Sequence, residues 1–175
     1  HSHAFQRGLR GRVQRKDPAR KDTFWTWREA MYELANRLGP NDIEALTRHC
    51  YMECLEAGYT AVGEFHYLHH REDGAPWNDR IATSRAVIRA AKEVGIRLNL
   101  FWTVYQRGGF SKPLEDGQRR FSAGCLDDVW RSLDELLELR ETGRIHVGLA
   151  LHSVRAVPED WLGPLAEGAR SRKIK

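Results

Sequence analysis

The sequence predicts an α/β fold made of parallel β/α units that form part of a (β/α)8 barrel. A helical pattern, a glycine and a β-branched and aromatic stretch follow one another three times along the chain, as is typical of right-handed crossovers between parallel strands. No G-x-G-x-x-G follows a predicted strand, which disfavours a doubly wound dinucleotide-binding sheet. The unusual polar clusters come directly after the predicted strands, where a barrel gathers its chemistry.

Four helices are expected, at residues 41–58, 78–94, 126–141 and from about Pro158 onward. Asn41 is expected to cap the first of them, with Glu44 completing a capping box. Strands are expected at 59–67, 96–105 and 144–152, each preceded by a glycine that ends a helix. The order predicts that His3, Tyr67 and His152 gather at one end of the sheet.

The number of strands is too small for a closed barrel, which needs eight strands and typically about 250 residues. With a first strand placed just before His1, these 175 residues supply four. Four parallel strands in an unclosed sheet would expose an edge and much apolar surface. We therefore expect a fragment, comprising about the first four β/α units of the barrel.

Composition excludes some classes of protein. A hydrophobic fraction of 41% suits a globular domain, and no apolar run is long enough to cross a membrane. With no signal-like N-terminal segment, a cytoplasmic location is expected. The three cysteines, Cys50, Cys54 and Cys125, are an odd number, which argues against a disulfide framework. The net charge is +4, and charged residues are mostly interspersed, except in two basic stretches at 7–21, interpreted as a loop, and at 170–175. No nucleic-acid partner is expected, because no base-reading motif accompanies these stretches.

The chain opens with "HSHAFQR". In an extended segment, side chains two residues apart share a face, so His1 and His3 could present two imidazoles to one cation. A zinc site usually has four ligands, of which three come from the protein when the site is catalytic. The pair therefore indicates part of a metal site, although a functionless terminus would show the same pattern.

Five motifs occur in order: "HSHAFQR", "FWTWREAMY", "EFHYLHH", "GQRRF" and "LHSVRAVP". Together they resemble the N-terminal half of the formimidoylglutamate deiminases, within the amidohydrolase superfamily. The resemblance implies a mononuclear zinc enzyme that hydrolyses N-formimino-L-glutamate to N-formyl-L-glutamate and ammonia, in histidine degradation. It also implies a homodimer when full length. The second half of the barrel and a small β-sandwich domain would be absent from residues 1–175.

The resemblance also assigns roles to residues. His1 and His3 match metal ligands, and five residues match substrate contacts: Gln6, Arg28, Tyr67, His152 and Arg155. No catalytic residue is implied within this chain, because the general acid/base and the remaining ligands would lie downstream. The isolated chain is therefore expected to bind zinc weakly and to be inactive.

The residue types suit this chemistry independently of the resemblance. Zinc lowers the pKa of bound water toward about 7, and arginine receives a carboxylate through a two-pronged pair, for which Arg155 is the first choice. Gln6 and Tyr67 can donate neutral hydrogen bonds, and His152 can orient the formimino group. The cluster His66, His69 and His70 is not expected to be a second metal site.

Two alternatives stay open. One is another amidohydrolase, such as a nucleobase or triazine deaminase, whose site would favour aromatic and amide contacts to a flat ring. The other is a non-catalytic basic domain that binds metal or nucleic acid through its histidine and arginine clusters.

Overall fold

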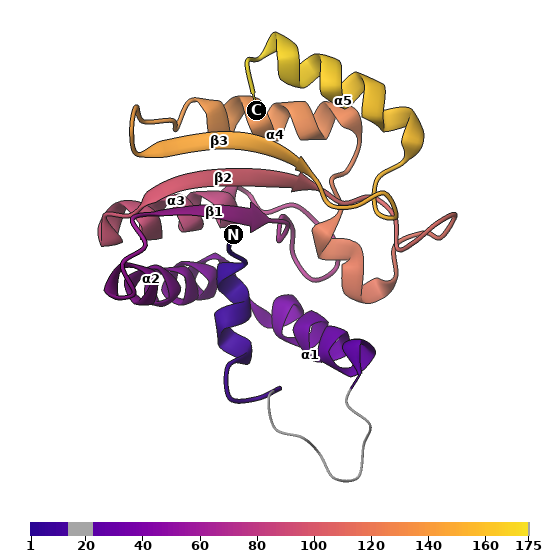
Figure 1. The fold of residues 1–175 in the computed structure, drawn as a ribbon. Coiled ribbons are helices and arrows are strands. Elements are labelled where there is room, and N and C mark those ends of the chain that lie inside the picture. The colour runs from indigo at the N-terminus through magenta and orange to yellow at the C-terminus, as the bar shows by residue number, and fades with distance from the viewer. Residues whose placement is uncertain (14–22, 175) are drawn as a thin grey trace.

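A parallel three-stranded sheet forms the centre of the computed structural model, which describes residues 1–13 and 23–174 (Figure 1). Strands β1 (Ala61–His66), β2 (Arg97–Val104) and β3 (Ile145–Leu151) lie side by side in chain order. Both pairs are parallel, as successive right-handed crossovers require. The predicted parallel β/α units are confirmed, and the sheet is a partial (β/α)8 barrel.

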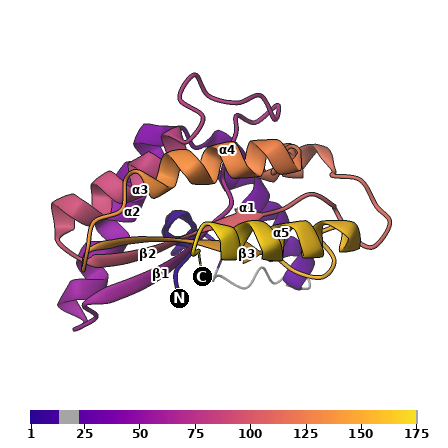
Figure 2. The same cartoon turned by 90° about the horizontal axis from the view of Figure 1, so that it is seen from above.

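Five α-helices flank the described sheet: α1 (Phe24–Arg37), α2 (Pro40–Glu56), α3 (Ala82–Val94), α4 (Leu126–Leu137) and α5 (Glu159–Ser171). Two short 3₁₀ helices, η1 (Ala4–Leu9) and η2 (Asp116–Phe121), lie near the carboxyl ends of the strands. Helix α3 packs on β2 and α4 on β3, along one face of the sheet (Figure 2). None of the described helices is both long and apolar enough to cross a membrane.

The core lies between this face of the sheet and the helices. Leu98, Leu100 and Trp102 alternate along β2 and are buried, whereas Asn99 between them is exposed, because successive side chains of a strand point to opposite faces. They belong to one apolar cluster with residues of α3 and α4. Burying each such side chain contributes about 1.5–3 kcal/mol, so the helix-covered face holds the sheet in place.

Residues 1–3 run beside β1 as a remnant of a fourth strand. Ser2 forms a parallel bridge to Glu64, in which its N–H donates to Gly63 O at 2.8 Å and its carbonyl accepts from Phe65 N at 2.9 Å. The chain then turns into η1. The first strand was predicted just before His1, whereas the bridge lies at Ser2; it places the histidine pair near the carboxyl ends of β1 to β3.

Helix α1 was not expected from the sequence. Thr23 caps it, because Thr23 Oγ1 accepts from the N–H groups of Trp25 and Thr26. Within α1, Met31 and Ala35 alone are buried, one turn apart, while Phe24 and Trp25 are more than half exposed. Because large apolar residues of α1 are exposed, its apolar residues do not identify the buried face of the helix.

The predicted capping of the next helix is wrong. Helix α2 begins at Pro40, with Gly39 as its N-cap, and the Asp42 carboxylate accepts from Gly39 N at 2.9 Å. Proline suits the first helical position because its ring fixes a helical φ and its missing N–H needs no partner. Glu44 instead forms ion pairs with Arg48 and Arg89.

Other boundaries differ by a few residues. Helix α3 starts at Ala82, after Asp79 accepts from Ile81 N, and it ends at Gly95, which adopts a left-handed φ of 86°. Pro158 is the N-cap of α5, not part of its first turn. Of the basic stretch 7–21, interpreted as a loop, residues 7–9 belong to η1, and 14–21 lie outside the described residues.

Candidate functional site

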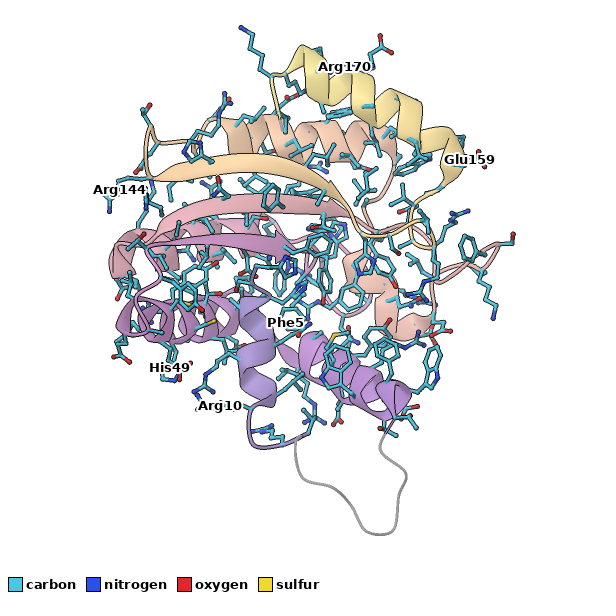
Figure 3. All side chains as sticks on the ribbon, viewed as in Figure 1. Phe5, Arg10, His49, Arg144, Glu159 and Arg170 are labelled. Atoms are coloured by element: carbon cyan, nitrogen blue, oxygen red, sulfur yellow. The ribbon has the colours of Figure 1, made fainter. Side chains whose placement is uncertain are left out.

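A cavity of about 190 Å³ opens at the carboxyl ends of the strands. Tyr67 follows β1, Tyr105 follows β2 and His152 follows β3, so three neighbouring strands each deliver one side chain to it. The structure brings six of the residues singled out in the sequence to this cavity: His3, Gln6, Arg28, Tyr67, His152 and Arg155. Figure 3 shows the side chains packed at this end of the sheet.

The two histidines of the opening motif converge, with their Nε2 atoms 3.0 Å apart. His3 Nδ1 lies 3.2 Å from the carbonyl oxygen of Phe65, which can only accept, so Nδ1 carries the proton and the Nε2 lone pair faces His1 Nε2. Burial lowers the pKa of His3, which keeps the ring neutral, the form that binds metal.

These two nitrogens fit two positions of a metal site. Nitrogens bound tetrahedrally at about 2.0–2.1 Å lie roughly 3.3 Å apart, close to the separation of His1 and His3 Nε2. Within residues 1–13 and 23–174, no group of three or more histidine, cysteine, aspartate or glutamate side chains is placed to hold an ion. The described residues therefore suit a partial ligand set.

A buried carboxylate holds the segment that carries this pair. Glu64 Oε1 accepts from Ala4 N at 2.8 Å, and Glu64 Oε2 accepts from the Tyr51 hydroxyl at 3.1 Å. Burial raises the pKa of Glu64, while hydrogen bonds from its neighbours oppose the rise. The backbone next to His3 is thereby tied to both β1 and α2.

Tyr67 forms one wall of the cavity and is 4% exposed. Its hydroxyl accepts from Gln6 Nε2 at 3.2 Å, and its ring packs edge-on against His3 and His152, with centroids 5.6 Å away in each case. Burial raises the pKa of Tyr67. A protonated phenol that already accepts from an amide can direct its own proton into the cavity.

His152 is held neutral at the end of β3. Burial above all, with smaller electrostatic effects of His3 and Arg155, lowers the pKa of His152 to about 4. Its Nδ1 lies 3.3 Å from Ser153 Oγ. Arg155, three residues on, is exposed at the cavity rim, and no carboxylate in the described part of the chain pairs with it.

Arg28 reaches the cavity from α1. Its guanidinium lies over the Trp25 ring at 4.8 Å and the Tyr32 ring at 5.3 Å. Its ion pair with Glu115 is long, at 3.5 Å, and Glu115 is mostly exposed, so solvent screens it. The stacked guanidinium therefore keeps donors available for an anion.

Four residues at this site were missed in the sequence: Tyr32, Tyr105, Arg107 and Gln118. Tyr32, Tyr105 and Arg107 line the cavity, and Gln118 is fully buried behind the two tyrosines. A signal existed for each of them. Tyr105 and Arg107 lie in the polar run "YQRGGF", which directly follows β2, Gln118 lies in "GQRRF", and Tyr32 ends "FWTWREAMY". Because helix α1 was not expected, the sequence did not show that Tyr32 faces the cavity.

The histidine cluster after β1 lies outside this cavity, in the core. His66 Nε2 is 3.2 Å from Thr83 Oγ1, and His69 Nε2 is 2.9 Å from Thr103 O. The His69 ring stacks on Trp102 with centroids 4.0 Å apart. Burial lowers the pKa of His66 to about 3. These contacts are those of neutral packing residues.

Parallel β/α units with imidazole, arginine and phenol groups beyond the carboxyl ends of the strands are those of a segment of a (β/α)8 barrel. A model of the amidohydrolase family matches residues 1–175. The chain belongs to the amidohydrolase family.

Two individual relatives support this family membership. A formimidoylglutamate deiminase from Pseudomonas aeruginosa is 42% identical over 170 residues, which cover 96% of this chain and 37% of that protein. The crystal structure of an amidohydrolase from Brucella melitensis superposes with a TM-score of 0.88 at 37% identity, covering 97% of this chain and 38% of that one. The chain thus spans little more than a third of the length of these relatives.

A more distant neighbour shares the fold. Atrazine chlorohydrolase from Arthrobacter aurescens TC1, crystallised with zinc, superposes over 100% of this chain and 38% of its own, with a TM-score of 0.75 and 20% identity. At that identity the similarity shows the fold alone.

Proposed function

We propose that the protein to which these residues belong is a metal-dependent deiminase that hydrolyses N-formimino-L-glutamate to N-formyl-L-glutamate and ammonia. The observation that carries the proposal is one cavity lined by His3, Gln6, Arg28, Tyr67, His152 and Arg155. The 42% identity to a formimidoylglutamate deiminase over nearly the whole chain supports it. The proposed protein acts on a small molecule, as a cytoplasmic homodimer.

The proposed metal is zinc, held in part by His1 and His3, whose Nε2 atoms converge. When bound, zinc supplies a water acidic enough to act as hydroxide at neutral pH. The solved zinc complex of atrazine chlorohydrolase, which shares the fold, supports this choice. The remaining ligands and the general acid/base are proposed to come from outside residues 1–175.

The side chains of the cavity suit a substrate with two carboxylates. Arg155 has no carboxylate partner among the described residues and can form a two-pronged, charge-assisted pair. Arg28, stacked on two aromatic rings, can neutralise a second carboxylate. A triazine or a nucleobase, which carries no carboxylate, would offer neither guanidinium group an anionic partner.

His152 and Tyr67 are suited to orient the formimino end of the substrate. His152 is neutral at pH 7, so one ring nitrogen can donate to the substrate while the other accepts. Tyr67 accepts from Gln6 and so has a proton to donate to a substrate oxygen. Tyr67 and Phe121 pack edge-on with ring centroids 5.3 Å apart and exclude water behind them.

The proposal is tested with the full-length protein by measuring ammonia release. N-formimino-L-glutamate is expected to be hydrolysed, whereas its γ-carboxamide analogue, cytosine and an aminotriazine are expected to react poorly. Rapid deamination of cytosine or the triazine, with no reaction of formiminoglutamate, would overturn the proposal.

Arg155→Met provides a sharper test. Loss of a hydrogen bond to a charged group costs about 1.5–3 kcal/mol, so kcat/KM should fall roughly 10- to 150-fold, with zinc content unchanged. Arg155→Lys should recover part of the loss, because an ammonium keeps the charge without the planar fork. Arg144→Met is the control, because Arg144 precedes β3 at the opposite end of the sheet (Figure 3). Equal kcat/KM for the Met variants of Arg144 and Arg155 would contradict the assignment.

A further inference from the structure

Two tyrosine hydroxyls beside the cavity share one buried amide. Gln118 Nε2 donates to the Tyr32 hydroxyl at 3.0 Å and to the Tyr105 hydroxyl at 3.1 Å. Gln118 is fully buried in η2, Tyr32 lies in α1, and Tyr105 follows β2. Three segments far apart in the chain therefore converge on one hydrogen-bonded group.

The direction of these hydrogen bonds is determined by the backbone. Gln118 Oε1 accepts from Glu115 N at 2.9 Å. A backbone N–H can only donate, so the amide cannot flip, and its NH₂ group must face the tyrosines. An NH₂ group has two donors and no acceptor, so both phenol oxygens act as acceptors and both phenol protons must be directed elsewhere.

At least one of these protons is left for a ligand. Burial raises the pKa of Tyr105, and a hydrogen bond with Tyr32 raises it further, so this phenol stays protonated. A bond between the two hydroxyls uses one of the two protons. Within the described residues, neither hydroxyl donates to any group other than its partner tyrosine. The other proton lacks an acceptor in the protein.

The surroundings indicate which acceptor is suitable. Both tyrosines line the cavity. The Arg28 guanidinium lies 5.3 Å above the Tyr32 ring, and the His152 ring is 4.5 Å from that of Tyr105. Phe121, fully buried, packs against both tyrosines from behind. A donor group on a rigid apolar support, next to a cation, favours an anionic oxygen.

We propose that the Tyr32 and Tyr105 hydroxyls, held as donors by Gln118, form a carboxylate-binding subsite in this cavity. The inference rests on the proposed function, because the second carboxylate of the proposed substrate, beside Arg28, would accept from these hydroxyls. The subsite makes the site selective for dicarboxylates.

The position of Gln118 depends on Gly108. A Cβ at residue 108 would lie 2.7 Å from Gln118 Oε1 and 2.4 Å from the carbonyl oxygen of Pro113. Both contacts are closer than van der Waals separation allows, so Gly108→Ala must displace the loop or the amide. This variant is expected to weaken dicarboxylate binding, because it displaces Gln118 and leaves both tyrosines in place.

The test measures binding of glutarate, an unreactive dicarboxylate, and butyrate, a monocarboxylate of similar length, to the full-length protein by calorimetry. Gln118→Glu keeps the shape of the side chain but replaces the NH₂ donors with acceptors, so the phenols donate to residue 118 and turn lone pairs toward the cavity. Glutarate affinity is expected to fall roughly 10- to 150-fold, and the preference for glutarate over butyrate is expected to disappear.

The variant Tyr32→Phe/Tyr105→Phe adds no charge and should produce the same loss of preference. Tyr59→Phe, at an exposed tyrosine before β1, is the matched control and should change nothing. Melting temperatures show which variants are folded, and if Gln118→Glu does not fold, the tyrosine double variant decides. An unchanged glutarate-to-butyrate affinity ratio in a folded double variant overturns the inference.

Failure of the proposed subsite can be told apart from failure of the proposed function. If the wild-type protein released no ammonia from formiminoglutamate, the proposed reaction would be wrong, while glutarate binding would still report on the subsite. If ammonia were released and the affinity ratio did not respond to the variants, the reaction would stand and the subsite would be wrong.

Discussion

The amide nitrogen of Ala4 donates to Oε1 of Glu64 across 2.8 Å, inside the protein. Ala4 directly follows His3, and Glu64 lies in β1, where it pairs with Ser2. The same carboxylate accepts from Tyr51 in α2. One buried side chain therefore determines where the histidine pair lies relative to the sheet.

Glu64→Ala should lower both stability and zinc affinity in the full-length protein. The change leaves the Ala4 N–H and the Tyr51 hydroxyl buried without partners, at about 1–3 kcal/mol each. By analogy with groups that orient metal ligands, zinc affinity should fall roughly 10- to 100-fold. Glu64→Gln, which can still accept from Ala4, should lose much less stability and zinc affinity than Glu64→Ala. Glu167→Ala, at an exposed position of α5, is the control. Chemical denaturation and chelator competition measure the two effects; unchanged zinc affinity in the Ala variant would show that Glu64 does not position the pair.

Arg107 should position the loop that carries Arg155. Its NH2 group donates to Val157 O at 2.6 Å and to Val154 O at 3.1 Å, on either side of Arg155. Arg107→Met should raise KM for formiminoglutamate by roughly tenfold or more, with a smaller effect on kcat, and should speed amide hydrogen exchange in residues 153–157. Lysine should restore part of the effect. If exchange in the loop were the same in wild type and Arg107→Met, a positioning role would be ruled out.

Stability should fall in acid partly because of His66. Burial, and then the charge of Arg120, lowers its pKa from 6.5 to about 3, so between these values the unfolded chain binds a proton that the folded chain does not. The contribution of His66 is fully present above pH 6.5 and is lost as the pH falls toward 3. The slope it adds is about 1.4 kcal/mol per pH unit.

His66→Gln should therefore flatten the dependence of unfolding free energy on pH between 6.5 and 4, even if it lowers stability at pH 7. His146→Gln, at an exposed position of β3, should leave the slope unchanged. Denaturant titrations at several pH values measure the slopes. Parallel curves for wild type and His66→Gln would contradict the prediction.

A polypeptide of residues 1–175 should bind zinc weakly and release no ammonia from formiminoglutamate. Two converging imidazoles are too few for a closed or catalytic site, and the described residues contain no group of three metal-ligating side chains. In the full-length protein, His3→Asn should lower zinc affinity by at least about tenfold, while His146→Asn should not. Metal analysis after dialysis against a chelator measures both, and stoichiometric zinc on the 175-residue polypeptide would refute the prediction.

Much of the fold could be predicted because the strands and most of the helices have recognisable local sequence patterns. The strands expected at 59–67, 96–105 and 144–152 are found within them, at Ala61–His66, Arg97–Val104 and Ile145–Leu151. Each follows a glycine and contains β-branched or aromatic residues. Helix α1 could not be predicted in this way, because its aromatic residues face the cavity and solvent while Met31 and Ala35 alone are buried.

Local patterns in the sequence predicted parallel strands and the polar residues that follow each strand, and these patterns were enough to place His3, Tyr67 and His152 at one end of the sheet. How those groups act depends on contacts that form when the chain folds. Gln118 and Tyr32 are 86 residues apart in the chain, yet their contact determines which way a phenol directs its proton. The tie between Ala4 and Glu64 spans 60 residues. Periodicity reports which side of an element is buried, whereas the direction of a hydrogen bond depends on the partner that folding places opposite it.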